Sequence, residues 1–299
     1  MTNKLSIRFF KDREVRAIWN DDESKWYFSV LDIIGAINEQ DDYQKNRNYW
    51  KYLKTKIRKE SSELVSGANQ LNGAINRMKL KAADGKSYLT DVVDQAGVEL
   101  LAKKIPNNRA NEFLDWFTYS DNSIDGQSRK KAYSLWESNL IAENEVGTVK
   151  AMQKIHAFLF GGLYDFAGKI RTKTISKGGT LFCRAEYLPQ NLEIIEQMPQ
   201  TTFDEIVDKY VEMNMAHPFM EGNGRSTRIW LDIIFKHSLK QCVDWSKIDK
   251  NAYLNAMHAS TTDSKPIKSL LKQALSDQIT DRELFMKGID YSYYYEQEE

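Results

Sequence analysis

The chain is poor in cysteine and proline and contains no long hydrophobic run. Cys183 and Cys242 are the only cysteines among 299 residues, too few for a disulfide framework or a structural zinc site, and both are expected to be buried. Five prolines and a hydrophobic content of 41% exclude a collagen-like or disordered chain. No stretch reaches the roughly 18 apolar residues of a membrane span, and the first residues lack a secretion signal. We therefore predict a cytoplasmic protein without a membrane span.

A net charge is also absent, since 42 lysines and arginines balance 42 acidic residues. Attraction to nucleic acid would therefore need a local patch. Residues 43–86 contain eleven cations, an excess of eight over the acidic residues: Lys45, Arg47, Lys51, Lys54, Lys56, Arg58, Lys59, Arg77, Lys79, Lys81 and Lys86. Tyr49, Trp50 and Tyr52 lie among them. This segment is predicted either to contact DNA phosphates or to be a solvated helix face, and the sequence leaves both open.

Aromatic and β-branched residues alternate near the start of the chain. Residues 15–19 and 26–28 are separated by the polar residues 20–24, which is typical of a β-hairpin. Ser29 can then cap a helix that extends to about Ile37. Further helices are expected over residues 49–54, 90–101 and 107–118. Residues 1–120 are thus predicted to form a small α+β domain.

The polar stretch 120–128 is predicted to separate that domain from a second one, residues 121–299. The second domain has a helical period almost throughout. The exception is residues 171–182, which alternate and turn at Gly178 and Gly179, as expected of a small hairpin. The predicted fold class is mainly α, an all-helical C-terminal domain with one β-hairpin flap.

One stretch of the second domain, HPFMEGNGRSTR from His217 to Arg228, concentrates glycines and charges between two predicted helices. The first helix, about residues 202–215, has one apolar face, and Pro218 ends it. The second, from Arg225 onward, is apolar almost all round and is expected inside a bundle. The loop thereby brings the backbone of Gly222, Asn223 and Gly224 to the amino terminus of a buried helix, which is a favourable place for an anion.

The charged residues of the stretch fit phosphate chemistry. Arg225 and Arg228 lie three residues apart and are expected over one site, where their guanidinium groups suit phosphate oxygens. Glu221 supplies an oxygen ligand for Mg²⁺. His217 can accept a proton from an attacking hydroxyl. Together they predict a phosphate-transfer site. The other histidines, His156, His237 and His258, are interpreted as ordinary core or surface residues.

These residues resemble the signature of the Fic family, H-P-F-x-[D/E]-G-N-G-R-x-x-R, at every defined position. The stretches IHAFLFGGLYDFAGKIRT and ISKGGTLF resemble the family's preceding helix and its flap, so the likeness covers roughly residues 128–275. The resemblance implies a helical protein adenylyltransferase that transfers AMP from ATP to a serine, threonine or tyrosine hydroxyl of a target protein.

The resemblance also implies roles for single residues. His217 would be the general base, Glu221 the Mg²⁺ ligand and Phe219 the core anchor of the loop. The residues expected to bind ATP are Gly222, Asn223, Gly224, Arg225, Arg228, Lys177, Gly178, Gly179 and Tyr253. The flap, about residues 176–182, would align an extended segment of the target by adding backbone hydrogen bonds to it.

Two other functions remain open. Doc toxins, which are related phosphotransferases, usually carry lysine where this chain has Gly224, so glycine favours adenylylation over phosphorylation. The other alternative is a DNA-binding regulator whose Fic domain only senses nucleotide. A sensor has no need of His217, and the intact motif therefore favours an enzyme.

The C-terminal sequence GIDYSYYYEQEE places Ser292 and Glu296 four residues apart. It resembles the inhibitory [S/T]-x-x-x-E-[G/N] element of some Fic proteins, except that Gln297 replaces glycine or asparagine. The resemblance implies an inhibitory helix over about residues 285–299. In it, Glu296 would pair with Arg228 and displace the γ-phosphate.

The N-terminal segment, about residues 5–118, resembles the BRO-N domain of phage and baculovirus proteins. The resemblance rests on WYFSVLDI, YWKYLKTKIRKE, MKLKAADGKSYLTDVVD and IPNNRANEFLDWF. It implies DNA binding, for which residues 43–86 are the expected contact region. The sequence leaves open whether the chain forms a homo-oligomer, and it does not identify the target protein.

Overall fold

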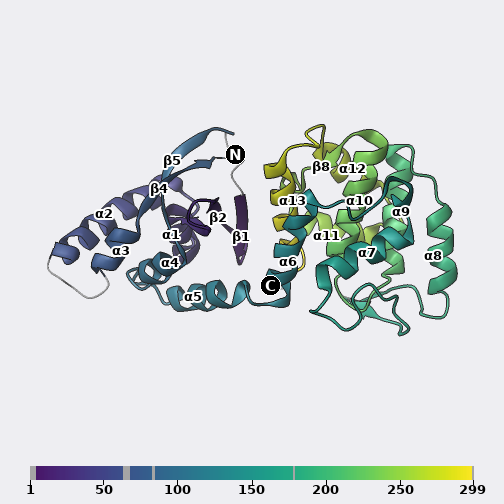
Figure 1. Ribbon diagram of the computed structural model, residues 1–299, viewed down its shortest axis with the longest axis horizontal. Coiled ribbons are helices and arrows are strands. Elements are labelled where there is room, and N and C mark those ends of the chain that lie inside the picture. The colour runs from purple at the N-terminus through teal and green to yellow at the C-terminus, as the bar shows by residue number, and fades with distance from the viewer. Residues whose placement is uncertain (1–4, 63–67, 83–84, 178, 298–299) are drawn as a thin grey trace. The chain divides into compact units, whose positions relative to one another are not determined.

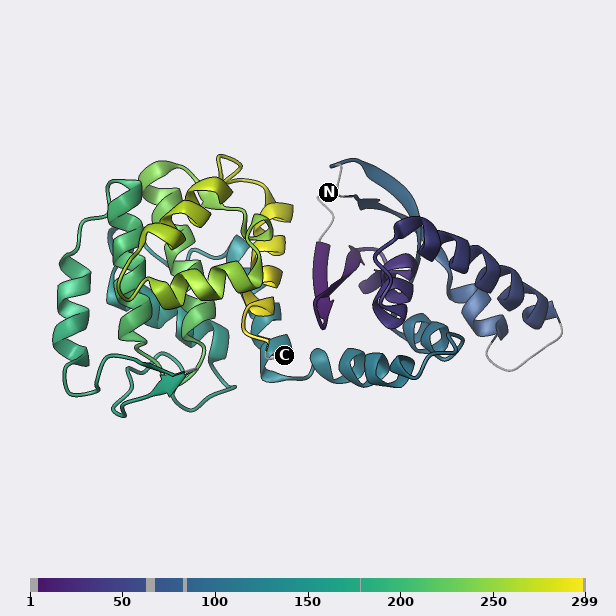
Figure 2. The same cartoon turned by 180° about the vertical axis from the view of Figure 1, so that it is seen from behind.

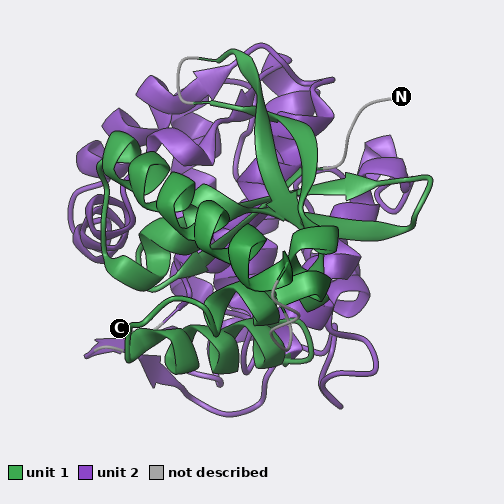
Figure 3. Ribbon diagram, turned by 90° about the vertical axis from the view of Figure 1, so that its left-hand side faces the viewer, with its two compact units in different colours: residues 1–123, 299 green, residues 124–298 purple. Residues whose placement is uncertain are grey.

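The computed structural model describes residues 5–62, 68–82, 85–177 and 179–297, and Figure 1 shows their course. Contacts divide the chain into an N-terminal unit that ends at Ser123 and a C-terminal unit that begins at Ile124, which Figure 3 distinguishes by colour. Within the described residues, no helix is long and apolar enough to cross a membrane.

The N-terminal unit combines a sheet with helices. Its elements are β1 (Leu5–Phe10), β2 (Arg13–Asn20), β3 (Lys25–Ser29), α1 (Val30–Asn38), α2 (Tyr43–Ser62), α3 (Ala68–Ala74), β4 (Asn76–Lys81), β5 (Ser87–Val93), α4 (Gln95–Ala102) and α5 (Arg109–Ser120). Within the described residues, the sheet has the strand order β1-β2-β3-β5-β4, and all neighbours are antiparallel. An α+β organisation is what alternating strands and amphipathic helices predict.

The predicted hairpin and the helix that follows it are confirmed. Strands β2 and β3 pair antiparallel, and Trp19 faces Trp26 across them, with ring centroids 5.4 Å apart. The hydroxyl of Ser29 accepts a hydrogen bond from the backbone N–H of Asp32 at 3.3 Å, which caps α1. Helix α1 is buried over most of its length and packs against α2, α4 and α5, so it forms the centre of this unit's core.

The expectation of one helix over residues 90–101 was wrong in its first half. Residues 90–93 belong to β5, where Val92 and Val93 are fully buried and pair with β3. The carboxylate of Asp94 then accepts from the backbone N–H of Gly97 at 2.9 Å and starts α4. Pairing with β3 and β4 gives these β-branched residues a sheet environment that the local sequence pattern does not reveal.

The C-terminal unit is a helical bundle. Its elements are α6 (Ile124–Ser134), η1 (Leu135–Glu137), η2 (Glu143–Glu145), α7 (Val149–Phe160), β6 (Ser176–Lys177), β7 (Thr180–Leu181), α8 (Leu188–Gln197), α9 (Phe203–Ala216), α10 (Asn223–Leu239), β8 (Cys242–Val243), η3 (Trp245–Lys247), α11 (Lys250–Ala259), α12 (Lys265–Ala274), β9 (Leu275–Ser276) and α13 (Arg282–Tyr294). Helix α10 contacts α7, α9 and α13, whereas α8 lies at the periphery (Figures 1 and 2). The first turn of α6 falls inside the polar stretch 120–128.

The prediction that the helix after the glycine-rich loop lies inside the bundle is confirmed. Trp230, Leu231, Ile234 and Phe235 of α10 are all fully buried. An α-helix without a polar face is stable only where other elements cover it on all sides. Burial is continuous from Arg225 to Leu231, so packing fixes the amino-terminal half of α10.

Helix α9 also follows its sequence pattern. Thr202 and Glu205 form a capping box at its start, and the helix ends at Ala216, just before Pro218, as predicted. His217 follows as the C-cap in a left-handed conformation, with φ 48°. The end of α9 thus sets the position of the histidine.

The predicted flap hairpin is present. Strands β6 and β7 pair antiparallel, Ser176 with Leu181 and Lys177 with Thr180. Gly179 has φ +80°, as a tight turn requires, and Gly178 lies outside the described residues. A second small pair, β8 with β9, was not predicted, because two-residue strands have no detectable alternation.

Replacing Thr202 by alanine removes the hydroxyl that accepts from the backbone N–H of Glu205. We expect the free energy of unfolding of the C-terminal unit to fall by about 1 kcal/mol. Urea denaturation followed by far-ultraviolet circular dichroism measures this change. Thr202→Ser keeps the hydroxyl and is expected to stay within about 0.5 kcal/mol of the unsubstituted chain. Equal losses in both variants would contradict a role for the cap.

Candidate active site

The loop between α9 and α10 is closed by one side chain. The amide oxygen of Asn223 accepts from the backbone N–H of Phe219 at 2.8 Å, and its amide nitrogen donates to the Phe219 carbonyl at 2.8 Å. Phe219 is fully buried, so its ring anchors the loop in the core, as expected. Both backbone groups of Phe219 are satisfied without water, which gives this loop a single well-defined shape.

Gly222 is required at the start of α10 for two independent reasons. It is the N-cap with φ +80°, a backbone conformation that residues with a side chain rarely adopt. A Cβ at this position would also lie 2.4 Å from the ring of Phe160. The first α10 hydrogen bond runs from Ser226 to the Gly222 carbonyl, so the N–H groups of residues 223–225 precede the helical ladder. N–H groups in this position at a helix amino terminus are suited to bind an anion.

His217 has its tautomer set by α9. Its Nδ1 lies 3.0 Å from the carbonyl oxygen of Asn214 and must donate a proton to it, which leaves Nε2 with a lone pair. The ring of Phe182 stacks on the imidazole with centroids 3.6 Å apart and planes 11° apart. Burial lowers the pKa of His217 to about 4, against the opposing effect of the Asn214 hydrogen bond. The imidazole is therefore neutral near pH 7 and can act as a base.

Arg171 holds the backbone around this histidine and was not identified from the sequence. Its Nε donates to the carbonyl of His217 at 2.7 Å, and Nη2 donates to the carbonyl of Ala216 at 3.0 Å. Its own N–H donates to the Pro218 carbonyl at 2.8 Å. The guanidinium is buried and thus replaces the helical hydrogen bonds that end at α9.

His156 of α7 also holds the loop, through the carbonyl of Glu221. Its Nδ1 accepts from the backbone N–H of Gly168 at 2.9 Å, so Nε2 carries the proton and donates to the Glu221 carbonyl at 2.8 Å. Its ring stacks on Phe219 with centroids 3.8 Å apart. Burial lowers its pKa to about 4. The residue is a core histidine, as interpreted from the sequence, but one that fixes the loop.

The two arginines of the motif have different partners. Arg225 is buried, and its guanidinium forms ion pairs with Asp125 of α6 and, at 2.9 Å, with Glu221. The same group lies 5.0 Å from the centre of the Phe160 ring. Arg225 is therefore held in place by an acid that the sequence analysis did not identify, Asp125.

Glu221 is the residue expected to bind Mg²⁺. One of its carboxylate oxygens accepts from Arg225 and from the backbone N–H of Gly222 at 2.9 Å, and the side chain is 47% exposed. Within the described residues, no group of three potential ligands could hold a metal ion alone. A single exposed carboxylate beside an anion-binding helix terminus fits Mg²⁺, which takes most of its ligands from phosphates and water.

Arg228 is occupied by the C-terminal segment. Its Nε donates to the hydroxyl of Ser292 at 2.7 Å, and Nη2 donates to the Ser292 carbonyl at 2.7 Å and to Glu296 at 2.6 Å. The arginine is 2% exposed and the Glu296 side chain 17%. Burial alone would raise the pKa of Glu296, but Arg228 and Arg225 lower it below that of an ordinary glutamate. The expected contact between Glu296 and Arg228 is thus present as a buried ion pair.

Glu296 also covers Gly224 and reaches the flap. A Cβ built on Gly224 would lie 2.1 Å from a Glu296 carboxylate oxygen. Lys177 of β6 is 3.6 Å from the other oxygen. The sequence predicted a helix over about residues 285–299 that contains Glu296. In the structure, helix α13 begins at Arg282 and ends at Tyr294, so Glu296 lies in the turn after the helix.

Tyr253 lies beneath the ion pair. Its hydroxyl accepts from Arg228 at 3.1 Å and is 2.6 Å from the hydroxyl of Tyr210, and its ring stacks on Tyr295 with centroids 4.8 Å apart. The side chain is 2% exposed. Tyr253 therefore positions Arg228 in this state of the chain.

We expect His217 and His156 to titrate with pKa values of about 4, below the ordinary value of 6.5. Between pH 4 and pH 6.5, these two histidines are protonated in the unfolded chain but not in the folded chain. The free energy of unfolding should therefore fall as the pH is lowered from 6.5 to about 4. Heteronuclear NMR of the imidazoles and urea denaturation at each pH measure both effects.

Phe182→Ala is the matched variant for this titration. It uncovers one face of His217 and should raise the pKa of that residue toward 6.5, while His156 keeps its value. A pKa near 6.5 for His217 in the unsubstituted chain would contradict the burial that the structure shows.

A search of protein families matches residues 147–235 to the model described as the Fic/DOC family. These residues run from the start of α7 into α10 and include the whole loop. The match confirms the resemblance seen in the motif. It does not extend to the N-terminal unit.

Curated relatives are similar over part of the chain. "Probable protein adenylyltransferase y4lH" of Sinorhizobium fredii is 27% identical over 134 residues, 40% of this chain and 69% of the relative. "Probable protein adenylyltransferase Fic" of Escherichia coli is 31% identical over 116 residues, 35% of this chain and 58% of the relative. The chain thus spans little more than half of the second protein.

Among solved structures, BepC of Bartonella tribocorum, crystallised with bound AMPPNP, is 18% identical. The alignment covers 55% of this chain and 90% of the BepC chain, with a TM-score of 0.47. From the family match and the curated relatives, residues 147–235 of this chain carry a Fic/DOC-family domain, and protein adenylyltransferases are among its homologues.

Proposed function

We propose that the chain is a protein adenylyltransferase that transfers AMP from ATP to a serine, threonine or tyrosine hydroxyl of a target protein, and that its own C-terminal segment inhibits it. The observation that carries this proposal is the position of a neutral histidine beside the amino terminus of a buried helix with two buried arginines. The Fic/DOC match and relatives named adenylyltransferases support the same activity.

The proton step belongs to His217. Its Nε2 lone pair takes the proton of the target hydroxyl as the hydroxyl oxygen bonds to the α-phosphorus of ATP. The bond from that phosphorus to the bridging oxygen breaks, and pyrophosphate leaves. Because Nδ1 is held by the Asn214 carbonyl, the imidazole keeps the orientation and tautomer that this step needs.

The anion-binding end of α10 receives the phosphates. The N–H groups of residues 223–225 and the helix dipole favour negative charge there. Arg225 is already oriented by Asp125, and Arg228 can bind a phosphate when Glu296 leaves. Mg²⁺, held by Glu221 together with phosphate oxygens, would neutralise part of the charge on the leaving group.

Inhibition follows from the ion pair that Arg228 makes. The guanidinium N–H groups of a buried arginine can bind one anion at a time, so Glu296 and a terminal phosphate of ATP compete for Arg228. Glu296 also fills the space in front of Gly224, where phosphate oxygens would approach the backbone. Tyr295 and Gln297 anchor the segment, since the Tyr295 hydroxyl donates to the Trp245 carbonyl at 2.7 Å and Lys250 donates to the Gln297 carbonyl at 2.8 Å.

Glu296→Gly removes the competing carboxylate and leaves α13 in place. We expect the rate of AMP incorporation to rise at least about tenfold, since losing a buried charge contact is worth about 2 kcal/mol or more and about 1.4 kcal/mol corresponds to a factor of ten. Incorporation from α-labelled ATP into the chain itself or into bacterial lysate proteins measures the rate.

The control is the double variant Glu296→Gly, His217→Ala, which should lose incorporation while still binding ATP. Label from γ-labelled ATP should not be transferred, and its transfer would instead favour the phosphotransferase alternative. AMP incorporation that persists in the double variant would contradict the proposed role of His217 as the base. Nucleotide binding without any incorporation in Glu296→Gly would favour a nucleotide sensor.

As a second, separate function, we propose that the N-terminal unit binds DNA through α2 and the β4–β5 hairpin. The observation favouring this is that Arg77, Lys79 and Lys81 alternate along β4, so they lie on one face of the strand and are all exposed. Some cations of the predicted patch are partly neutralised: Asp91 pairs with Lys54 at 2.7 Å and with Arg77 at 3.1 Å, and Glu60 lies 3.9 Å from Lys56. The exposed cations on this face of β4 suit a phosphate backbone without base-specific contacts.

Lys79→Gln together with Lys81→Gln should weaken binding of a DNA duplex and reduce the slope of log affinity against log salt by about 2. Fluorescence anisotropy over a salt series measures both quantities. Lys103→Gln and Lys130→Gln, which change lysines outside residues 43–86, are the matched control and should leave the slope unchanged. No binding by the unsubstituted chain at low salt would rule out this function and leave adenylylation unaffected.

A further inference from the structure

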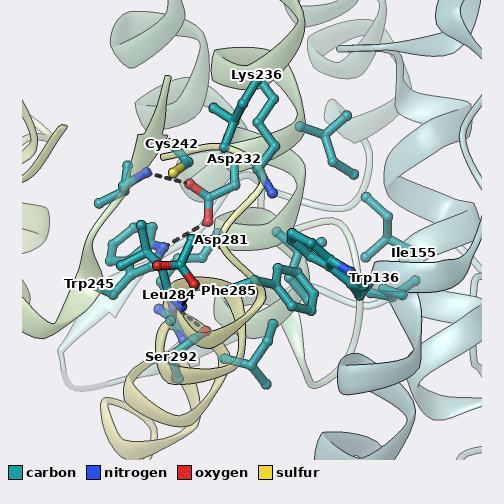
Figure 4. Close-up of a pocket in the computed structure, with 18 of the residues that line it drawn as sticks. Trp136, Ile155, Asp232, Lys236, Cys242, Trp245, Asp281, Leu284, Phe285 and Ser292 are labelled. Carbon is teal, nitrogen blue, oxygen red and sulfur yellow. Dashed lines mark hydrogen bonds between the residues drawn. The ribbon is translucent and has the colours of Figure 1, made fainter. Parts of the chain in front are cut away.

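A cavity of about 390 Å³ lies inside the C-terminal unit between η1, α10 and α13, and Figure 4 shows its lining. Its walls are mostly apolar, with Trp136, Ile233, Trp245, Leu284 and Phe285 among them. Its volume falls in the range of sites that enclose small molecules. Gln278 and Thr280, which also line it, are exposed and mark its opening to solvent.

The inner end of the cavity reaches the inhibitory contact. Arg228 and Ser292 are both lining residues, and they are hydrogen-bonded to each other as described above. The carboxylate of Glu296 binds the same guanidinium. The cavity therefore lies behind the ion pair, with α13 as one of its walls.

One lining cation, Lys236, forms no ion pair among the described residues, and the carboxylate of Asp232, one helical turn earlier, acts on it only at longer range. The Lys236 ammonium lies 5.6 Å from the centre of the Trp136 ring and 5.2 Å from that of Phe285. In the part of the chain that the structure describes, no carboxylate lies within ion-pair distance of it. Figure 4 shows its side chain directed toward Trp136.

The neighbouring carboxylate is already used by the protein. One oxygen of Asp232 accepts from the backbone N–H of Val243 at 3.0 Å, and the other accepts from the indole N–H of Trp245 at 2.9 Å. Asp232 therefore serves to fix η3 and the small β8 strand. The second lining acid, Asp281, caps α13 by accepting from the backbone N–H groups of Glu283 and Leu284 at 2.8 and 3.2 Å. Arg228 is paired with Glu296, so Lys236 is the lining cation whose ammonium can bind a ligand.

We propose that this cavity binds a small amphipathic anion, with its aromatic or aliphatic body against Trp136, Phe285 and Leu284 and its single acidic group on Lys236. The apolar walls stabilise the body by removing it from water. A charge-assisted hydrogen bond to the ammonium selects an anion over a neutral molecule of the same shape.

Such a ligand stabilises the docked position of α13. Leu284, Phe285 and Ser292 of α13 complete the cavity, so a ligand that fills it binds this state and not one in which α13 has moved away. A ligand shifts an equilibrium only toward the state it binds better. This inference rests on the proposed inhibition by Glu296. The cavity is then an effector site, and the ligand bound in it keeps the enzyme inactive.

The probes for this site are 1-anilinonaphthalene-8-sulfonate and its uncharged relative N-phenyl-1-naphthylamine, followed by fluorescence. Lys236→Met keeps the length of the side chain and removes its charge. We expect it to weaken binding of the sulfonate about fivefold or more and to leave the neutral probe unchanged. Lys272→Met is the matched control, because Lys272 lies over the ring of Phe203 outside the cavity, and it should change neither affinity.

Two results would overturn the proposal. These are failure of the unsubstituted chain to bind either probe, and equal weakening of both probes by Lys236→Met.

Hydrogen exchange tests the coupling to α13. Saturating sulfonate should slow exchange of the α13 amides, residues 282–294, and faster exchange there would overturn the predicted direction. Neither fluorescence nor exchange measures catalysis. Absence of AMP incorporation in Glu296→Gly would therefore contradict the proposed function alone.

Discussion

The buried amino terminus of α10 constrains the whole C-terminal unit. Its helix is buried over its first half and on one face of its second half, so its first turn and the loop before it are fixed by packing. Asn223 closes that loop on the backbone of Phe219, and His156 and Arg171 hold its carbonyls from opposite sides. A base on a loop of this length is useful only if such contacts restrict it, because proton transfer depends on sub-ångström placement.

Arg228 shows how a buried charge can connect two states of one site. Leaving a guanidinium at 2% exposure without an anion would cost several kcal/mol, so the protein must supply a partner whenever a ligand does not. Glu296 is that partner in the structure. Under the proposed inhibition, exchange of Glu296 for a phosphate would keep the arginine satisfied and would limit the energetic difference between the two states. A small difference is what an effector bound behind α13 could shift.

Much of the active-site loop could be predicted from the sequence, because its features are local. Periodicity located α9 and α10, Pro218 marked the end of α9, and the glycines marked the turn before α10. The ion pair between Arg228 and Glu296 was predicted from a resemblance in a short C-terminal pattern, although the helix carrying it ends earlier than expected.

The residues that support the site were not predictable in the same way. Asp125, Arg171 and Phe182 act through contacts with segments distant in the sequence, and no spacing rule relates them to the motif. The strand at residues 90–93 was missed for the same reason, since β-branched residues before a helix cap fit either structure until a neighbouring strand is known. Tertiary contacts decided each of these cases.

Gly224 ties the chemistry of the site to its regulation. The position that a lysine would occupy in a phosphotransferase is the one that the Glu296 carboxylate fills, at 2.1 Å from where a Cβ would stand. A side chain there would force the Glu296 carboxylate to shift from this position. If the proposed inhibition holds, a substitution at this one residue would alter both the space for the transferred group and the contact that restrains it.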